Sequence, residues 1–348
     1  MIDPSGHRRL GNSSVEVTAL GLGGAALGNL YATVAEDDAL GVVAEALDAG
    51  IRYFDTAPAY GYGVSEQRIG SGLARAGADD VVIATKVGWR LDPATGTRDW
   101  GIWADAPALE VSMDFSPQAV RKSISESLAR LGRERVDILW IHDPDEAASA
   151  GGRNPTARGH FAEAMAGAYP VLDELRSQGS VGAIGVGLSQ WEMLAEFAEA
   201  GDFDAFLLAN RYTLLEQEPL RELFPLCEKN QISIVIGGAF NSGILATGAV
   251  EGARYDYAPA SDRVLDRVRQ LESVCARHRV DLPAAALQFP LAHPVVASVV
   301  FGARSRAEVA DNCRYLRQEI PMAFWQELKE RGMIDLDAPV PSPTGDAR

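Results

Sequence analysis

Eight short apolar runs recur along the chain, and a longer amphipathic segment follows each of them. Within a run the apolar residues are consecutive rather than alternating, a pattern typical of parallel strands that are covered on both faces. We predict one strand for each run, at residues 17–23, 52–57, 81–87, 136–142, 183–188, 205–210, 233–238 and 296–302.

The segments between the runs have helical spacing of their apolar residues. Residues 37–50 end at a glycine, and residues 116–132 begin with Ser116 as N-cap and Pro117 at the first helical position. Eight strand–helix units without a break in composition favour one (β/α)8 TIM barrel. A doubly wound sheet, which needs a reversal of strand order, is the alternative. We predict a single domain over residues 1–348, with the barrel core at about 17–313.

Four further segments lie outside this repeat. Residues 8–17 predict a β-hairpin with a Gly-Asn turn that closes the bottom of the barrel. The long connections 88–115 and 239–260 follow the C-terminal ends of the third and seventh predicted strands, where barrel enzymes carry their sites. Residues 335–348 contain several prolines and predict a mobile tail.

Composition and charge exclude several classes of protein. Hydrophobic residues make up 47% of the 348 residues, and the net charge of -16 argues against binding to nucleic acid or to anionic membrane surfaces. The three cysteines are far apart and form no CxxC motif, so neither a disulfide framework nor a structural zinc site is expected. The chain has no apolar stretch of membrane-spanning length and no apolar signal-peptide core near its start. We expect a cytoplasmic protein, whose oligomeric state the sequence leaves open.

Four side chains that can carry chemistry lie at or just after predicted strands: Asp55, Tyr60, Lys86 and His142. The C-terminal ends of parallel strands meet at one mouth of a barrel, so we expect these groups to converge. Lys86 lies inside an apolar run, and a buried ammonium group needs a carboxylate partner. Asp55 on the neighbouring strand is the candidate partner. A purely structural ion pair is the alternative interpretation.

The same four residues suggest a proton-transfer mechanism. A tyrosine hydroxyl has an unperturbed pKa near 10, and a nearby Lys86 cation is predicted to lower the pKa of Tyr60. Asp55 would keep Lys86 charged, and His142 would hydrogen-bond the substrate oxygen. Such a set suits hydride transfer between a carbinol or carbonyl carbon and a nicotinamide.

Other residues near these strands have more than one possible interpretation. Trp89, Trp100 and Trp103 in the connection 88–115 either contact substrate or pack as part of a lid. Asp143 and Asp145 follow His142, but no second histidine has ligand spacing, so we predict loop capping and no metal site.

Three sequence segments resemble the aldo-keto reductase family: GIRYFDTAPAYGYGVSEQRIG (50–70), IATKVG (83–88) and ILWIHDPD (138–145). The similarity continues in family order from residues 20–28 to 302–312. Within the family, the chain is most similar to the galactose, fucose and threo-aldose 1-dehydrogenases and to pyridoxal 4-dehydrogenase. The resemblance implies that Asp55, Tyr60, Lys86 and His142 form a catalytic tetrad. We expect Tyr60 and His142 to contact the substrate, and Trp89 and Trp103 are candidate substrate contacts from the connection 88–115.

The resemblance also implies a nicotinamide cofactor, NAD with NADP possible. Ser189 and Gln190 take the place of the family's carboxamide clamp, and residues 241–245 match the loop over the pyrophosphate. The implied cofactor residues are Gly24, Ala25, Asp55, Ser189, Gln190, Asn210, Gly238, Asn241, Ser242, Gly243, Leu245, Gly302, Arg304, Glu308 and Asn312.

The choice between NAD and NADP depends on one position of this set. NADP-using relatives commonly have an arginine at the position that Glu308 occupies here. A carboxylate repels a 2′-phosphate and accepts a hydrogen bond from a ribose hydroxyl, so the resemblance implies a preference for NAD. Arg304 and Arg306 are nearby cations that could hold a phosphate instead.

The expected function is therefore NAD(P)-dependent oxidation of a small hydroxyl or carbonyl compound, such as the hemiacetal carbon of an aldose or a pyridoxal-like ring. An NADPH-driven aldehyde or ketone reductase is the alternative within the same class. A nucleotide-sensing regulatory subunit is the alternative from another class, and a complete tetrad argues against it.

Overall fold

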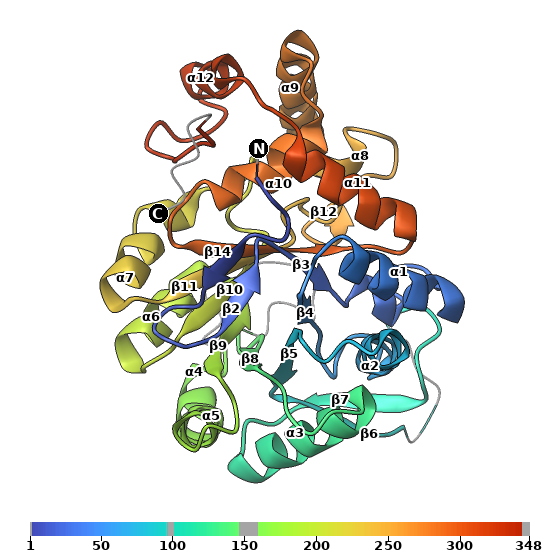
Figure 1. The fold of residues 1–348 in the computed structure, drawn as a ribbon. Coiled ribbons are helices and arrows are strands. Elements are labelled where there is room, and N and C mark those ends of the chain that lie inside the picture. The colour runs from blue at the N-terminus through green and yellow to red at the C-terminus, as the bar shows by residue number, and fades with distance from the viewer. Residues whose placement is uncertain (1, 95, 97–100, 146–158, 343–348) are drawn as a thin grey trace.

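The structure is a computed structural model that describes residues 2–94, 96, 101–145 and 159–342. Eight parallel strands form a closed barrel (Figure 1), which confirms the predicted (β/α)8 architecture. Around the barrel the strands are β3 (Leu20–Gly23), β4 (Tyr53–Asp55), β5 (Val82–Val87), β8 (Ile138–His142), β9 (Ala183–Leu188), β10 (Ala205–Ala209), β11 (Ser233–Gly237) and β14 (Val296–Gly302).

Each predicted strand corresponds to one strand of the barrel. Most predicted bounds differ slightly from the observed ones, and the first run differs most, because it joins the end of β2 (Glu16–Thr18) to β3. Every barrel strand is buried along most of its length, as its consecutive apolar residues require.

Helices surround the barrel and cover the outer faces of its strands (Figure 1). Capping residues set some of their ends: Ser116 Oγ accepts a hydrogen bond from the amide of Ala119, and Gly132 follows the same helix with φ of 61°. The helical segments are η1 (Ala26–Gly28), α1 (Glu36–Asp48), α2 (Val64–Ala76), α3 (Pro117–Leu131), α4 (Phe161–Glu163), η3 (Ala164–Ala168), α5 (Tyr169–Ser177), α6 (Trp191–Ala200), η4 (Glu218–Leu220), α7 (Leu223–Asn230), α8 (Ile244–Thr247), α9 (Asp262–His278), α10 (Leu282–Leu291), α11 (Arg306–Arg317) and α12 (Met322–Glu330).

The barrel interior is filled by large side chains that face glycines. Tyr53 of β4 and Trp140 of β8 are fully buried. A Cβ atom at Gly21 would collide with the Tyr53 ring, and one at Gly185 would collide with the Trp140 ring. The two glycines therefore give these large rings their space between the strands.

The predicted N-terminal hairpin is present, and it closes one end of the barrel. β1 (His7–Arg9) pairs antiparallel with β2. Leu10, Val15 and Val17 are buried in one cluster with interior residues of the barrel strands. The hairpin lies before β3 and packs at the N-terminal ends of the strands, so the opposite mouth stays available for a site.

The two long connections contain regular structure that the sequence did not reveal. β6 (Trp89–Pro93) and β7 (Leu109–Met113) form an antiparallel pair beside α3. The later connection holds α8 and a short hairpin of β12 (Arg254–Tyr255) and β13 (Ala258–Pro259). Trp103 forms an isolated bridge with Leu30, so the first connection contacts the loop after β3. Trp100 lies outside the described residues.

The first part of the predicted tail packs against the barrel. Asp335 forms an ion pair with Arg221, and Ala338 is fully buried. Residues 343–348 lie outside the described residues, and the mobility of the tail stays a prediction. No helix in the described part of the chain is long and apolar enough to cross a membrane.

Candidate active site

Asp55 and Lys86 form an ion pair inside the barrel mouth. Asp55 ends β4 and Lys86 lies on β5, and both side chains are almost completely buried. The Lys86 ammonium group donates to Asp55 Oδ1 and, over 2.9 Å, to the carbonyl oxygen of Thr56. The predicted pairing is therefore present, on neighbouring strands of the barrel.

Asp55 has two further donors that come from the barrel interior. Trp140 Nε1 donates to Asp55 Oδ2 over 2.9 Å, and the Tyr53 hydroxyl approaches the same oxygen at 3.5 Å. Burial raises the pKa of Asp55, while the Lys86 cation and these donors act against the rise. The carboxylate is thus held in one position from three sides.

Tyr60 and His142 lie over this pair. The Lys86 Nζ atom is 5.0 Å from the centroid of the Tyr60 ring. The rings of Tyr60 and His142 meet edge to face, with centroids 5.5 Å apart. Tyr60 is positioned by backbone contact, because Gly28 and Gly61 approach each other too closely for a Cβ atom on either. The four residues predicted to converge do so.

The electrostatics of Tyr60 differ from the prediction. Burial raises the pKa of the Tyr60 hydroxyl well above its ordinary value, and the carboxylates of Asp55 and Asp143 add to the rise. We predicted a lowered pKa from the Lys86 cation. Asp55 offsets much of the charge of Lys86, and burial disfavours the phenolate. Tyr60 is consequently a protonated donor at neutral pH.

His142 is neutral at the same pH. Burial lowers the pKa of its imidazole well below the ordinary value, and the Lys86 cation acts in the same direction. Its Nδ1 atom is buried and has no hydrogen-bond partner among the described residues. A neutral imidazole can donate a hydrogen bond from one ring nitrogen to a substrate oxygen.

Both predicted substrate tryptophans border these rings. The Trp103 ring lies 5.8 Å from the Tyr60 ring, and the Trp89 ring lies 6.5 Å from His142, between centroids. Trp89 Nε1 is buried without a partner in the described part of the chain. The two tryptophans therefore lie beside the Tyr60 and His142 rings of the tetrad.

The residues implied for the cofactor lie at the same end of the barrel, mostly on the strands across from β5. Gly24 and Ala25 follow β3, Ser189 and Gln190 follow β9, Asn210 follows β10, Gly238, Asn241, Ser242, Gly243 and Leu245 follow β11, Gly302 ends β14, and Arg304, Glu308 and Asn312 lie just before or within α11. The barrel order places these strand ends next to one another.

Several of these residues fit a nucleotide. Asn241 Oδ1 and Asn312 Oδ1 are buried acceptors with no partner among the described residues, as expected of groups that a ligand's donors satisfy. Asn241, Ser242 and Gly243 have positive φ, so the backbone turns sharply after β11. Leu245, by contrast, is fully buried in the hydrophobic core, so its side chain supports the loop rather than lining a site.

Other implied residues are held by the protein itself. The amides of Ser189 and Gln190 donate to Asp145 Oδ2, so Asp145 caps this loop as predicted. The Gly24 amide donates to the carbonyl oxygen of Asp55, and a Cβ atom at Gly24 would collide with Ser65. In the described residues no cluster of His, Cys, Asp and Glu could hold a metal.

Two groups at the mouth were not predicted. Tyr257, at the tip of the β12–β13 hairpin, reaches Asn210 Nδ2 with its hydroxyl at 3.5 Å. Arg211, directly after Asn210, forms an ion pair with Asp256 of the same hairpin over 2.7 Å between Nη1 and Oδ1. No sequence pattern predicts these contacts, because the partners are more than forty residues apart in the chain.

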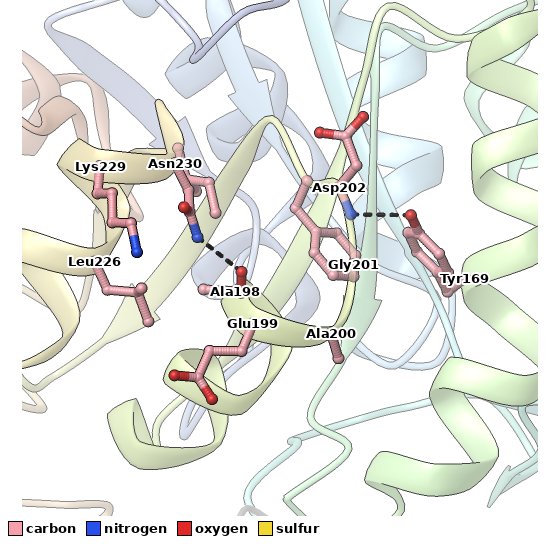
Figure 2. Close-up of a pocket in the computed structure, with 11 residues that line it drawn as sticks. Tyr169, Ala198, Glu199, Ala200, Gly201, Asp202, Leu226, Lys229 and Asn230 are labelled. Carbon is pink, nitrogen blue, oxygen red and sulfur yellow. Dashed lines mark hydrogen bonds between the residues drawn. The ribbon is translucent and has the colours of Figure 1, made fainter.

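The pocket drawn in Figure 2 lies away from this chemistry. Its walls come from the C-terminal ends of α6 and α7 and from residues just before β10 and β11, at the opposite end of the barrel. Its tyrosine, Tyr169, accepts a hydrogen bond from the amide of Asp202. We therefore place the candidate active site at the mouth that holds Asp55 and Lys86.

The chain is similar to known proteins over most of its length. A sequence model of the aldo/keto reductase family matches residues 19–331. The chain belongs to the aldo/keto reductase family. D-threo-aldose 1-dehydrogenase of a Pseudomonas species is 39% identical over 328 residues, covering 92% of this chain and 96% of the relative. Pyridoxal 4-dehydrogenase of Microbacterium luteolum is 37% identical over 345 residues, covering 95% and 98%.

Solved structures share the fold of this aldo-keto reductase. An aldo-keto reductase of Bacillus halodurans, in its holo form, superposes with a TM-score of 0.72 at 24% identity, covering 93% of this chain and 95% of the other. Glycerol dehydrogenase of Gluconobacter oxydans superposes with the same score at 22% identity. The chain is thus an NAD(P)-dependent oxidoreductase that acts on small molecules with hydroxyl or carbonyl groups.

Proposed function

We propose that this aldo-keto reductase is an NAD-linked dehydrogenase that oxidises the hemiacetal carbon of an aldose or a pyridoxal-like ring to a lactone. The convergence of Tyr60, Lys86 and His142 around buried Asp55 is the observation that carries the proposal. Two relatives that are more than a third identical are named as dehydrogenases of an aldose and of pyridoxal.

Tyr60 exchanges the proton in the proposed reaction. During oxidation the substrate hydroxyl gives its proton to the Tyr60 oxygen, and the C–H bond of the same carbon gives up a hydride, so the substrate loses two electrons. His142 donates a hydrogen bond to the same substrate oxygen and fixes its position. The ion pair with Asp55 keeps the Lys86 cation fixed beside the Tyr60 ring. A bound oxidised nicotinamide supplies the hydride acceptor and a positive charge, which opposes the raised pKa of Tyr60.

The test is oxidation of aldoses and pyridoxal by the purified protein, followed by absorbance of the reduced nicotinamide and by identification of the lactone. We expect oxidation to become faster as the pH rises, because Tyr60 must lose its proton first. NADPH-linked reduction of aldehydes without any hemiacetal oxidation would contradict the proposed direction. Tight cofactor binding without turnover would favour the nucleotide-sensing alternative.

The preference for NAD is supported by how the charges around α11 are engaged. The Glu308 carboxylate accepts a hydrogen bond from the Arg304 amide over 2.7 Å, which holds it at the start of the helix. The Arg304 guanidinium donates to the carbonyl oxygen of Leu30, and Arg306 lies 3.6 Å from Glu45 of α1. The Glu308 carboxylate would repel a 2′-phosphate, and both arginines would have to leave their present contacts to bind it.

Steady-state kinetics with both cofactors test this preference. We expect the wild type to favour NAD, and Glu308→Arg to shift the ratio of kcat/KM values towards NADP by tenfold or more. Asp311→Arg is the matched control, because it makes the same charge change on the exposed side of α11. A wild type that already favours NADP tenfold would contradict the NAD assignment, and an equal shift in both variants would show that Glu308 is not the selector.

A further inference from the structure

Asp143 lies beside the reacting groups, although the proposed reaction does not use it. It follows His142 at the end of β8, where φ of 45° turns the chain out of the strand. Aspartate tolerates this left-handed conformation better than most residues. The turn places Asp143 Oδ2 3.4 Å from His142 Nε2. Burial raises the pKa of Tyr60 and of Tyr257, and the charge of Asp143 adds to both rises, so its carboxylate lies near these two phenols.

Among the described residues, no lysine or arginine forms an ion pair with the Asp143 carboxylate. Lys86 attracts it, but the ammonium group is bonded to Asp55. His142 is neutral, and the 3.4 Å separation from its Nε2 is longer than a normal N–H···O hydrogen bond. Burial and the charge of Asp145 raise the pKa of Asp143 well above its ordinary value. The Asp143 side chain is only partly buried, with 22% of its surface exposed, so a donor from a ligand can reach this carboxylate.

The neighbouring Asp145 is engaged by the backbone through one oxygen, while its Oδ1 atom is buried without a partner in the described residues. Its Oδ2 atom accepts hydrogen bonds from two backbone amides, those of Ser189 and Gln190. Capping of this loop accounts for Asp145, and no equivalent pair of amides is found at Asp143 in the described residues. The two carboxylates are two residues apart, yet in the described part of the chain only Asp145 accepts hydrogen bonds from these loop amides.

The aromatic rings beside Tyr60 and His142 suit a substrate ring with C–H faces. Trp103 and Trp89 border Tyr60 and His142, and aromatic faces pack well against the C–H faces of a sugar-like ring. The unpartnered Trp89 Nε1 offers a hydrogen-bond donor to a ring oxygen. This end of the barrel therefore combines two aromatic rings, one hydrogen-bond donor and one carboxylate.

We infer that Asp143 is a specificity residue that accepts a hydrogen bond from the substituent on the carbon next to the reacting carbon. This inference rests on the proposed function. When His142 Nε2 contacts the reacting oxygen, the substituent on the adjacent ring carbon lies beside it, and the 3.4 Å spacing of Nε2 and Asp143 Oδ2 matches two such neighbouring atoms. The site thus selects rings with a hydroxyl or ammonium donor at that carbon and rejects an anionic group there.

Three substrates and one isosteric variant test this inference: an aldose that the wild type oxidises, its 2-deoxy analogue and its 2-amino-2-deoxy analogue. Hydrogen bonds to charged groups contribute enough to change rates by roughly tenfold to a hundredfold. In the wild type we expect kcat/KM to fall by that factor for the 2-deoxy analogue and to stay within threefold for the 2-amino analogue. In Asp143→Asn the acceptor becomes an uncharged amide oxygen, so we expect the advantage of the parent and 2-amino sugars over the 2-deoxy sugar to shrink, while the 2-deoxy sugar itself changes less than threefold.

Asp202→Asn is the matched control, because it removes one carboxylate at the opposite end of the barrel and should leave all three values unchanged. Reduced-cofactor binding, followed by tryptophan fluorescence, should be equal in the wild type and in Asp143→Asn. Equilibrium binding of the three sugars to the reduced-cofactor complex of Tyr60→Phe should show the same penalty for the 2-deoxy sugar.

Two results would overturn the inference while the proposed function stands: a wild type that oxidises the 2-deoxy and parent sugars equally well, or an Asp143→Asn variant that keeps the full 2-deoxy penalty. The first of these needs no variant, so it holds even if Asp143→Asn folds poorly. A wild type that binds the cofactor but oxidises no hemiacetal would overturn the proposed function and the inference together.

Discussion

At the end of the barrel that the hairpin covers, Leu10, Val15 and Val17 pack against apolar interior residues. At the other end, Asp55, Lys86 and His142 are equally buried but are polar or charged. Apolar contacts at the first end stabilise the fold without directional requirements, whereas each buried polar group at the second end requires a partner. Changes at the first end should therefore reduce stability alone, and changes at the second should reduce activity.

Tyr60→Phe is expected to produce the largest effect. Loss of the hydroxyl removes the proton exchange but keeps the ring that contacts His142 and Trp103. General acid–base catalysis contributes about a hundredfold to ten-thousandfold, so kcat should fall by that factor while cofactor binding and the melting temperature stay near wild type. Steady-state kinetics and cofactor titration measure this. Activity within threefold of the wild type would refute the role of Tyr60.

Lys86→Met should affect activity and stability together, because the ion pair belongs to the catalytic end. Asp55 would keep the Trp140 and Tyr53 donors but lose its cation. Breaking a buried pair costs about 3–5 kcal/mol in the free energy of unfolding. Denaturant unfolding measures that loss.

The double variant Asp55→Asn/Lys86→Met separates the two effects of this ion pair. It should recover most of the stability without activity, because no unpaired charge is left in the barrel. A stable and active single variant Lys86→Met would show that the ion pair is dispensable.

Leu10→Ala tests the opposite end. Leu10 is fully buried against the barrel interior, and comparable core truncations cost about 2–5 kcal/mol. We expect the midpoint of urea unfolding to fall while kcat/KM at 25 °C changes less than twofold. A large loss of activity in the folded variant would mean that the two ends are coupled through the barrel strands.

Glu327→Gln should have the smallest effect, because Glu327 belongs to neither end. It joins α12 to α9 through Arg277 and His278, and these partners lower the pKa of Glu327 to about 2. A carboxylate with a lowered pKa stabilises the fold above its ordinary pKa of 4.5, and this stabilisation is lost as the pH falls towards 2. The melting temperature of the variant should be slightly below wild type at pH 7, with a difference that shrinks below pH 4.5. Differential scanning calorimetry at several pH values checks this, and unequal activity of the two proteins would contradict it.

The local pattern of the chain was enough to predict the eight strands, the N-terminal hairpin and the pairing of Lys86 with Asp55. Consecutive apolar residues mark strands that are covered on both faces, and a lysine among them requires a nearby carboxylate. The hairpin of β6 and β7 was not predicted, because its residues are only half-buried and carry no such run.

The tertiary structure alone decided the electrostatics of the mouth. The pKa of Tyr60 depends on burial and on the distances from its hydroxyl to the Lys86 cation and to the Asp55 and Asp143 carboxylates. No spacing in the sequence encodes these quantities. The same holds for Asp143 and Asp145, which the sequence treats alike: one caps the loop after β9, and the other faces His142. The strands follow from near neighbours along the chain, whereas the charge balance of the site follows from groups that only the closed barrel brings together.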